Sequence, residues 1–456
     1  MAMGRRKGER QEPLFVTAED LPKSLGHPFY TVLNRLLDEA GFDRWIENRC
    51  QQYYDQDESR GQRSIPPGVY FRMLLVGYFE GIDSQRGIAW RCADSLSLRA
   101  FLGIPLDKNT PDHSTLSLTR KRLPPEVFSE VFQFVLQIAA DKKLLSGKTV
   151  GVDSTTLEAN AAMKSIVRRE TGEDWKKYVT RLMREEGAIP EDHEPSADEL
   201  RRFDRSRKKK SVANQDWVNP HDPDAKIMKM KDGTTHLAYK AEHVVDLKTD
   251  VIVAAEIRTA TDADTQTLSD SVMQAQLNLT AIGHEQQIEE VVADKGYHSA
   301  DSLELGQHLN FRTYVPEPKR TGNWDWSERT EDHERAVMNN RKRMKHQKGK
   351  ALQRARSELC ERSFAHVCET GGMRRTWLKG LVETTKRYLV AAAAHNLGRV
   401  LLKLFGVGKP RGLQGFGDVF SECSRVIAVV LALHHRWRSV LRCIGHGRPR
   451  LAALAG

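Results

Sequence analysis

The spacing of apolar residues changes near residue 146, and this change divides the chain into two parts of different fold class. Before it, apolar residues recur every three to four positions, as in "PFYTVLNRLLDEAGF" (28–42) and "PEVFSEVFQFVLQIAADKKLL" (125–145). That spacing gathers them on one face of a helix. Short breaks that contain Pro and Gly, such as "IPPG", separate the periodic segments. We therefore predict an all-helical N-terminal domain over residues 1–145.

After this point the apolar residues alternate with polar ones, which is typical of strands. "GKTVGVDSTTLEA" is predicted to be a strand, and "THLAYKAEHVVD" and "DVIVAAEIRTA" are predicted to form a hairpin. A helix at about 263–279 comes next, and the strand "IEEVVAD", a helix, the short strand "FRTYVP" and further helix follow it. The fold class is therefore α+β, with a mixed β-sheet and flanking helices over residues 146–405.

Two segments do not fit this alternation. Residues 158–235 are rich in charge and interrupted by Pro, so we expect an insertion carried on a loop rather than a second hydrophobic core. Residues 406–456 are expected to form a basic C-terminal tail or helix.

Composition narrows the class of partner and the compartment. The chain has 456 residues and a formal net charge of +10, which makes polyanions compatible partners. Its six Cys show no spacing typical of a metal site, so free thiols in a reducing compartment are expected. The N-terminal residues lack the apolar run of a signal peptide, and apolar stretches such as "VIAVVLAL" are too short to span a bilayer. We expect a cytoplasmic protein without a membrane partner.

Two acids stand at the ends of predicted strands. Asp153 follows "VGV" and Asp294 follows "EEVVA". If these strands are neighbours, both carboxylates lie at the same edge of the sheet, where they would repel each other unless a cation lies between them. Hard oxygen ligands favour Mg²⁺ or Mn²⁺, and Glu358 or Glu361 of a later helix offers a third carboxylate. The alternative is that each Asp only caps a turn, and that the two Glu pair with nearby Arg residues.

These residues lie within stretches that resemble the DDE transposases of bacterial insertion sequences, in the broad insertion-sequence four/five superfamily. The resemblance covers most of residues 65–405. It rests on "PPGVYFRMLLVGYFEGIDSQRGIAWRCADSLSLRAFLG", "TPDHSTLSLTRKRL", "VGVDSTTLEANAAM", "DPDAKIMKMKDGTTHLAYKAEHVVD", "ADKGYHS", "CERSFAHV" and "KRYLVAAAAHNLGRVL".

The resemblance implies a ribonuclease H-like catalytic core that binds two divalent ions and cuts and joins DNA at the ends of a mobile element. It places the catalytic and metal-binding acids at Asp153, Asp294 and Glu361. The family's last motif often has Arg and Lys around its acid, where this chain has Ser357 and Cys368. Its implied partners are transposon ends and target DNA, bound by a homodimer.

Several cations and one aromatic residue near these acids are candidates for contact with DNA. Lys295 and Tyr297 follow the second acid, and a basic run lies between the second and third acids: Arg341, Lys342, Arg343 and Lys345. Lys and Arg bind backbone phosphates, and Tyr stacks or donates a hydrogen bond. A solvated basic face and a packed Tyr297 are the ordinary alternatives.

The leading hypothesis is a transposase that binds inverted-repeat ends and catalyses cleavage and strand transfer. A stand-alone nuclease on the same core is one alternative. A catalytically inactive DNA-binding relic that acts as a repressor is another.

Overall fold

The computed structural model describes residues 17, 28–54, 64–207, 213–230, 233–319, 326, 329–408 and 410 of the chain. Nearly all of the predicted tail at 406–456 therefore lies outside the described residues.

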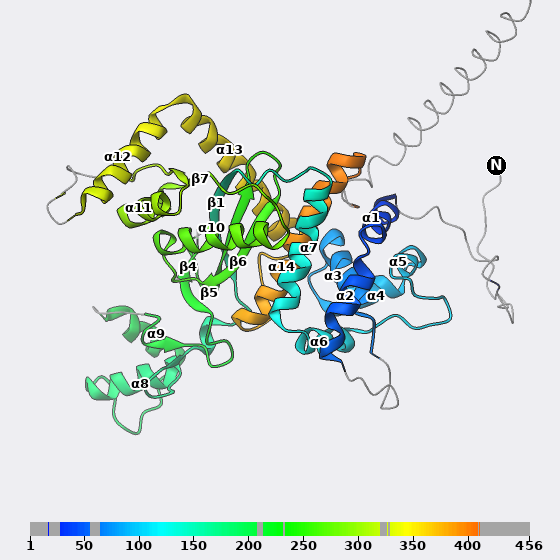
Figure 1. The fold of residues 1–456 in the computed structure, drawn as a ribbon. Coiled ribbons are helices and arrows are strands. Elements are labelled where there is room, and N and C mark those ends of the chain that lie inside the picture. Colours follow the sequence, from blue (N-terminus) through cyan, green and yellow to red (C-terminus); the bar gives the residue numbers. More distant parts are fainter. Residues whose placement is uncertain are drawn as a thin grey trace, which may run out of the picture.

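The N-terminal part is helical, as predicted (Figure 1). Its elements are α1 (Pro28–Glu39), α2 (Phe42–Cys50), η1 (Gln51–Tyr53), α3 (Pro67–Glu80), α4 (Gln85–Ala93), α5 (Leu96–Phe101), α6 (His113–Arg122) and α7 (Pro125–Asp141). Side chains before several helices satisfy the first free N–H groups: Asp112 accepts from the backbone N–H of Thr115 at 2.8 Å, and Ser84 accepts from that of Gly87 at 3.0 Å. The sequence thus fixes these helix starts locally.

The mixed sheet also follows the prediction. Its strands are β1 (Thr149–Glu158), β4 (Lys226–Lys229), β5 (Thr235–Asp246), β6 (Ile252–Thr259), β7 (Glu290–Ala293) and β8 (Arg312–Tyr314). Strands β5 and β6 form the predicted antiparallel hairpin, and β5 also pairs antiparallel with β1. On its other side β1 pairs parallel with β7, which pairs parallel with β8. The order β6-β5-β1-β7-β8, with these orientations, is consistent with a ribonuclease H-like core.

Helices cover the sheet and connect it to the N-terminal part. They are α10 (Asp264–Ala281), α11 (Ala300–His308), α12 (Glu331–Lys345), α13 (Gln347–Phe364), the π-helical turn η4 (Ala365–Thr370) and α14 (Leu381–Phe405), with the short turn η3 (Lys295–Tyr297) after β7. Helix α14 packs against both α7 and β6 (Figure 1). The Asn396 side chain hydrogen-bonds the backbone N–H and C=O of Ile252, both at 2.8 Å, and so satisfies an edge of β6.

Within the insertion the chain forms η2 (Met163–Ser165), β2 (Val167–Arg168), α8 (Trp175–Glu185), α9 (Ala197–Ser206) and β3 (Trp217–Val218). Helices α8 and α9 lie away from the sheet (Figure 1). Val179, Met183 and Leu200 are buried together in a small hydrophobic cluster of their own. The expectation that this segment lacks a core is therefore wrong. Both helices are amphipathic, and pairing their apolar faces removes those faces from water.

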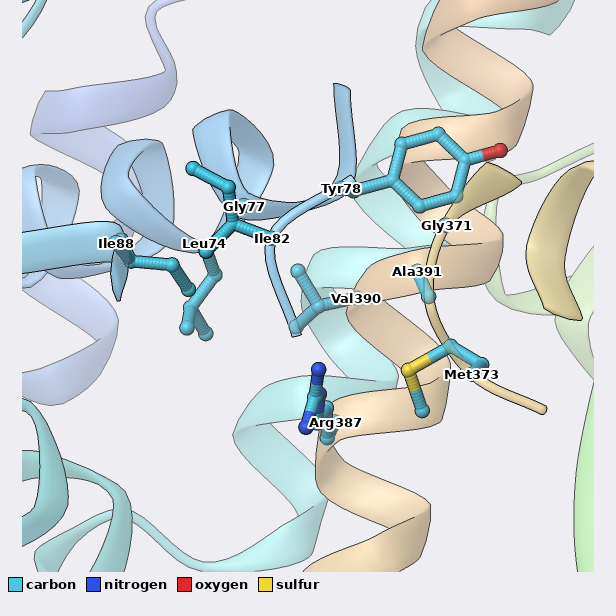
Figure 2. Close-up of a pocket in the computed structure, with 10 residues that line it drawn as sticks. All are labelled: Leu74, Gly77, Tyr78, Ile82, Ile88, Gly371, Met373, Arg387, Val390 and Ala391. Atoms are coloured by element: carbon cyan, nitrogen blue, oxygen red, sulfur yellow. The ribbon is translucent and has the colours of Figure 1, made fainter. Parts of the chain in front are cut away.

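A small cavity of about 30 Å³ marks the contact between the N-terminal helices and the sheet domain (Figure 2). Its lining comes from Leu74, Gly77, Tyr78, Ile82 and Ile88 on one side and from Gly371, Met373, Arg387, Val390 and Ala391 on the other. Burial in this mostly apolar surrounding lowers the pKa of Arg387 to about 10. One continuous hydrophobic core includes buried residues of both parts.

Candidate active site

Asp153 and Asp294 occupy equivalent positions on neighbouring parallel strands. The last pair in the β1–β7 register is Val152 with Ala293, and the two acids are the next residue on each strand. Because adjacent strands are about 4.8 Å apart and equivalent positions point to the same face, the two acids are neighbours at the point where the β1–β7 pairing ends. The prediction that Asp153 ends its strand is wrong, because β1 continues to Glu158 through its pairing with β5; only Asp294 directly follows the last residue of its strand. The condition set in the sequence analysis, that these strands are neighbours, is met.

Each of the two carboxylates has a local backbone partner. Asp153 Oδ1 accepts from the backbone N–H of Ser154 at 2.9 Å, and Asp294 Oδ1 accepts from that of Gly296 at 2.7 Å. Asp294 is thus the cap of η3, as the alternative reading proposed. Capping occupies one oxygen of a half-buried carboxylate, so it does not exclude a second role for Asp294.

Helix α13 crosses the sheet above these acids. Gln353 donates to the carbonyl oxygens of Ala293 at 3.0 Å and Tyr314 at 2.7 Å, beyond which β7 and β8 end. Arg356 Nη1 lies 2.9 Å from Asp153 Oδ2. A methyl group on Gly151 would lie 3.0 Å from Arg356 Cγ and 3.1 Å from Cys360 Sγ, so the missing side chain allows the close approach of α13 to β1.

The two candidate third acids lie three residues apart on α13 and have different partners. Glu358 forms an ion pair with Arg362, which also bonds Asp250 Oδ2 at 3.1 Å in the turn between β5 and β6. Glu361 accepts from Ser357 Oγ at 2.8 Å. The 3.6-residue helical repeat puts Glu361 on the side of Ser357 and Glu358 on the side of Arg362, and both acids are exposed.

The three acids predicted to bind metal do not form a closed cage. Within the described ranges, no group of three or more His, Cys, Asp and Glu side chains is arranged to hold a metal ion. What the structure brings together is Asp153 and Asp294, with the guanidinium of Arg356 on Asp153. Two carboxylates at one sheet edge are a hard donor pair that suits Mg²⁺ or Mn²⁺, so the residues present fit such an ion in part.

His243 is a neighbour of Asp153 that the sequence analysis missed. It is the cross-strand partner of Asp153 in the β1–β5 register and is fully buried. Its Nδ1 hydrogen-bonds Ser363 Oγ and its Nε2 hydrogen-bonds the Tyr388 hydroxyl, both at 2.8 Å, and burial lowers its pKa to about 3. His243 is therefore neutral and joins β5 to two helices. The motif "YKAEHVVD" contains it, but no spacing in the sequence singles it out.

A buried charged network supports the site from the other face of the sheet. Lys240 Nζ lies 2.6 Å from Asp264 Oδ1, which also accepts from Ser154 Oγ at 3.2 Å. Thr267 donates to Glu242 Oε1 at 3.2 Å, and burial raises the pKa of Glu242. A methyl group on Gly296 would lie 2.9 Å from Asp264 Oδ2 and 3.0 Å from Asp294 Oδ1. Asp264, which the sequence analysis did not single out, therefore lies near the turn of Asp294 and contacts Ser154, the residue after Asp153.

Two segments of the chain match known families. Residues 17–122 match a family described as a transposase domain, and residues 320–401 match one described as a transposase DDE domain. These two matches support a DDE transposase of the insertion-sequence type. The second match includes Glu361, whereas Asp153 and Asp294 lie outside both matched segments. No curated protein and no solved structure matches the chain.

The matches support a general activity for the protein, namely that of a transposase. Transposases act on DNA, and transposase DDE domains generally use divalent metals. Among the described residues of the transposase, no helix is long and apolar enough to cross a membrane.

The predicted DNA-contact residues of the transposase differ in how available they are. Lys295, Lys342 and Lys345 are exposed. Arg341 instead forms a two-pronged ion pair with Glu317 at 2.6 and 2.8 Å, and Arg343 donates to Thr313 at 2.9 and 3.0 Å. Tyr297 is fully buried, which contradicts a stacking contact between its ring and DNA. The alternative, a packed Tyr297, is correct, because this residue at the end of η3 is part of the hydrophobic core.

Proposed function

We propose that this transposase binds the inverted-repeat ends of an insertion sequence and catalyses metal-dependent DNA cleavage and strand transfer. Asp153, Asp294 and Glu361 are the proposed catalytic acids and the proposed ligands of two Mg²⁺ or Mn²⁺ ions. The observation that carries the proposal is the pairing of β1 with β7, because it brings two acids 141 residues apart to the same position at one sheet edge. Such an edge is where α/β proteins place their sites.

The choice of Glu361 as the third acid is supported by the different partners of the two acids on α13. Glu358 is held in an ion pair with Arg362, which also bonds Asp250. Glu361 instead accepts a hydrogen bond from the neutral hydroxyl of Ser357. Ser357, which stands where the family often has Arg, is thus the group that orients the Glu361 carboxylate.

The chemistry divides between the ions and the protein. Two bound ions would activate the attacking oxygen and stabilise the leaving oxygen of an in-line displacement at phosphorus. The chain contributes position and charge: β1 and β7 set the separation of two carboxylates, and α13 supplies the third. No covalent intermediate with the protein is required, so water serves for cleavage and a DNA 3′-hydroxyl serves for strand transfer.

The proposed DNA surface combines the helical N-terminal part with the exposed Lys295, Lys342 and Lys345. We place end recognition in residues 1–145, where α6 ends in the basic residues Arg120, Lys121 and Arg122. A homodimer on DNA would hold both element ends, and a cytoplasmic, nucleoid-associated location follows from this partner.

The test is an assay of cleavage and joining on linear DNA that carries the sequences flanking the coding region, with Mg²⁺ or Mn²⁺. We expect the wild-type protein to cut and join, and Asp153→Asn, Asp294→Asn and Glu361→Gln to do neither while still binding the DNA. Cleavage without joining would indicate the nuclease alternative. DNA binding without metal-dependent cleavage by the wild type would indicate the inactive relic.

A further inference from the structure

Arg356 places a positive charge beside Asp153, the first of the three proposed catalytic acids. Its Nη1 lies 2.9 Å from Asp153 Oδ2, and the side chains are only 12% and 20% exposed, respectively. This is not a surface ion pair that water screens freely. The Arg356 stem lies over Gly151, where even a methyl group would be 3.0 Å from Cγ, so packing restricts the position of the guanidinium.

The two oxygens of Asp153 have different partners. Oδ1 accepts from the backbone N–H of the next residue, Ser154, while Oδ2 faces Arg356. Asp294 is the neighbouring acid on β7, and the cross-strand neighbour His243 is neutral. Arg356 therefore offsets the repulsion between two adjacent carboxylates in the free protein.

A divalent ion at this edge would need Asp153 Oδ2, the oxygen that Arg356 holds. A guanidinium and a divalent cation repel each other strongly when both contact one carboxylate in a partly buried site. Occupation by one therefore weakens occupation by the other.

We propose that Arg356 is an internal counter-cation of Asp153: it holds the carboxylate in place in the free protein and competes with the divalent ion for Oδ2. The proposal rests on the proposed function, because it takes Asp153 to be a metal ligand. It also gives a role to the Arg that stands one residue before Ser357. The family often has its Arg at the position of Ser357. A shift of one residue along α13 rotates the side chain around the helix, so the guanidinium of Arg356 faces the sheet. Arg356 is thus a positioning residue.

The experiment measures Mn²⁺ binding to the full chain without DNA, from the electron paramagnetic resonance signal of free Mn²⁺. Arg356→Gln removes the competing charge and should bind Mn²⁺ about tenfold more tightly. A tenfold change is the effect of a neighbouring charge that changes the pKa of a carboxylate by about one unit. Arg354→Gln is the matched control, because Arg354 is exposed on the same helix and its loss changes the net charge equally. It should leave the affinity unchanged. Arg356→Lys keeps the charge on a shorter, more mobile group and should give a smaller gain.

The variants separate the two proposals. If Asp153→Asn weakens Mn²⁺ binding but Arg356→Gln and Arg356→Lys bind no more tightly than wild type, the competition is refuted and the metal site stands. If Asp153→Asn leaves Mn²⁺ binding unchanged, the metal site itself is refuted, and the role of Arg356 with it. A gain in Arg356→Gln that disappears in the double variant with Asp153→Asn supports the proposal. Thermal unfolding of each variant checks that it folds. If Arg356→Gln does not fold, the Mn²⁺ affinity of Arg356→Lys decides between the outcomes.

Discussion

Asp153 and Asp294 follow the last hydrogen-bonded pair of two adjacent parallel strands, so their carboxylates face the same side of one sheet edge. Each has one oxygen bound by a nearby backbone N–H, which fixes the side chains without neutralising them. The charge at Asp153 is offset by Arg356, which reaches it from α13. The pairing of β1 with β7 therefore positions the two acids, and the packing of α13 brings a positive charge to one of them.

The different partners of Glu358 and Glu361 on α13 predict different effects for these two acids. Glu361→Gln should lower metal-dependent DNA cleavage by about a hundredfold or more, because it removes a proposed metal ligand. Glu358→Gln should stay within about twofold of wild type, because it loses only an exposed ion pair with Arg362. Single-turnover cleavage rates measure both. An equal loss of cleavage rate in both variants would show that these partners do not decide which Glu is the third acid.

Gly151 should be intolerant of even one methyl group. The new Cβ in Gly151→Ala would lie 2.7 Å from Leu247 Cδ2, 3.0 Å from Arg356 Cγ and 3.1 Å from Cys360 Sγ, so α13 must move away from β1. We expect a loss of about 1–3 kcal/mol in the free energy of unfolding, measured by urea denaturation. Gly398→Ala is the control. Gly398 lies within α14, and a Cβ there would be an ordinary 3.5 Å from Phe79 of α3, so the free energy of unfolding should stay unchanged or rise by up to about 1 kcal/mol.

His243 should make the fold sensitive to mild acid. Burial lowers its pKa from 6.5 to about 3, so below pH 6.5 the unfolded chain takes up a proton that the folded protein does not. Stability from this group is present above about pH 6.5 and is lost as the pH falls toward 3, by about 2 kcal/mol between pH 7 and pH 5. Urea denaturation at both pH values measures the change. His243→Gln should be less stable at pH 7 but show a smaller fall; an unchanged fall would assign the acid sensitivity to other groups.

The basic run of α12 should separate into DNA contacts and structural contacts. Lys342→Ala with Lys345→Ala should weaken DNA binding several-fold and reduce its salt dependence, because two exposed cations no longer neutralise phosphates. Arg341→Ala should instead lower thermal stability, since it leaves Glu317 without its two-pronged partner. Fluorescence anisotropy over a range of salt concentrations tests the first, and a melting curve tests the second. The reverse pattern would place the DNA elsewhere.

Much of the fold could be predicted because its signals are local. The change of apolar spacing near residue 146 separates the helices from the sheet, and the hairpin of β5 and β6 follows from two alternating runs with a short turn between them. The small core of the insertion was missed, because short amphipathic helices in a charged segment resemble solvated loops. Arg341 and Arg343 seemed free for DNA because their partners, Glu317 and Thr313, come from a preceding segment that no spacing rule connects to them.

By itself the sequence determined which residues could carry the chemistry: an acid on each of two predicted strands, two acids on one helix and a cation-rich run, together with the resemblance that ordered them. The tertiary structure decided which of them meet. Register puts Asp153 beside Asp294, Arg362 pairs with Glu358 but not with Glu361, and Gly151 lets Arg356 reach Asp153. Spacing along a chain fixes only neighbours within a turn or a strand, whereas contacts between distant segments arise when the apolar faces of strands and helices pack together.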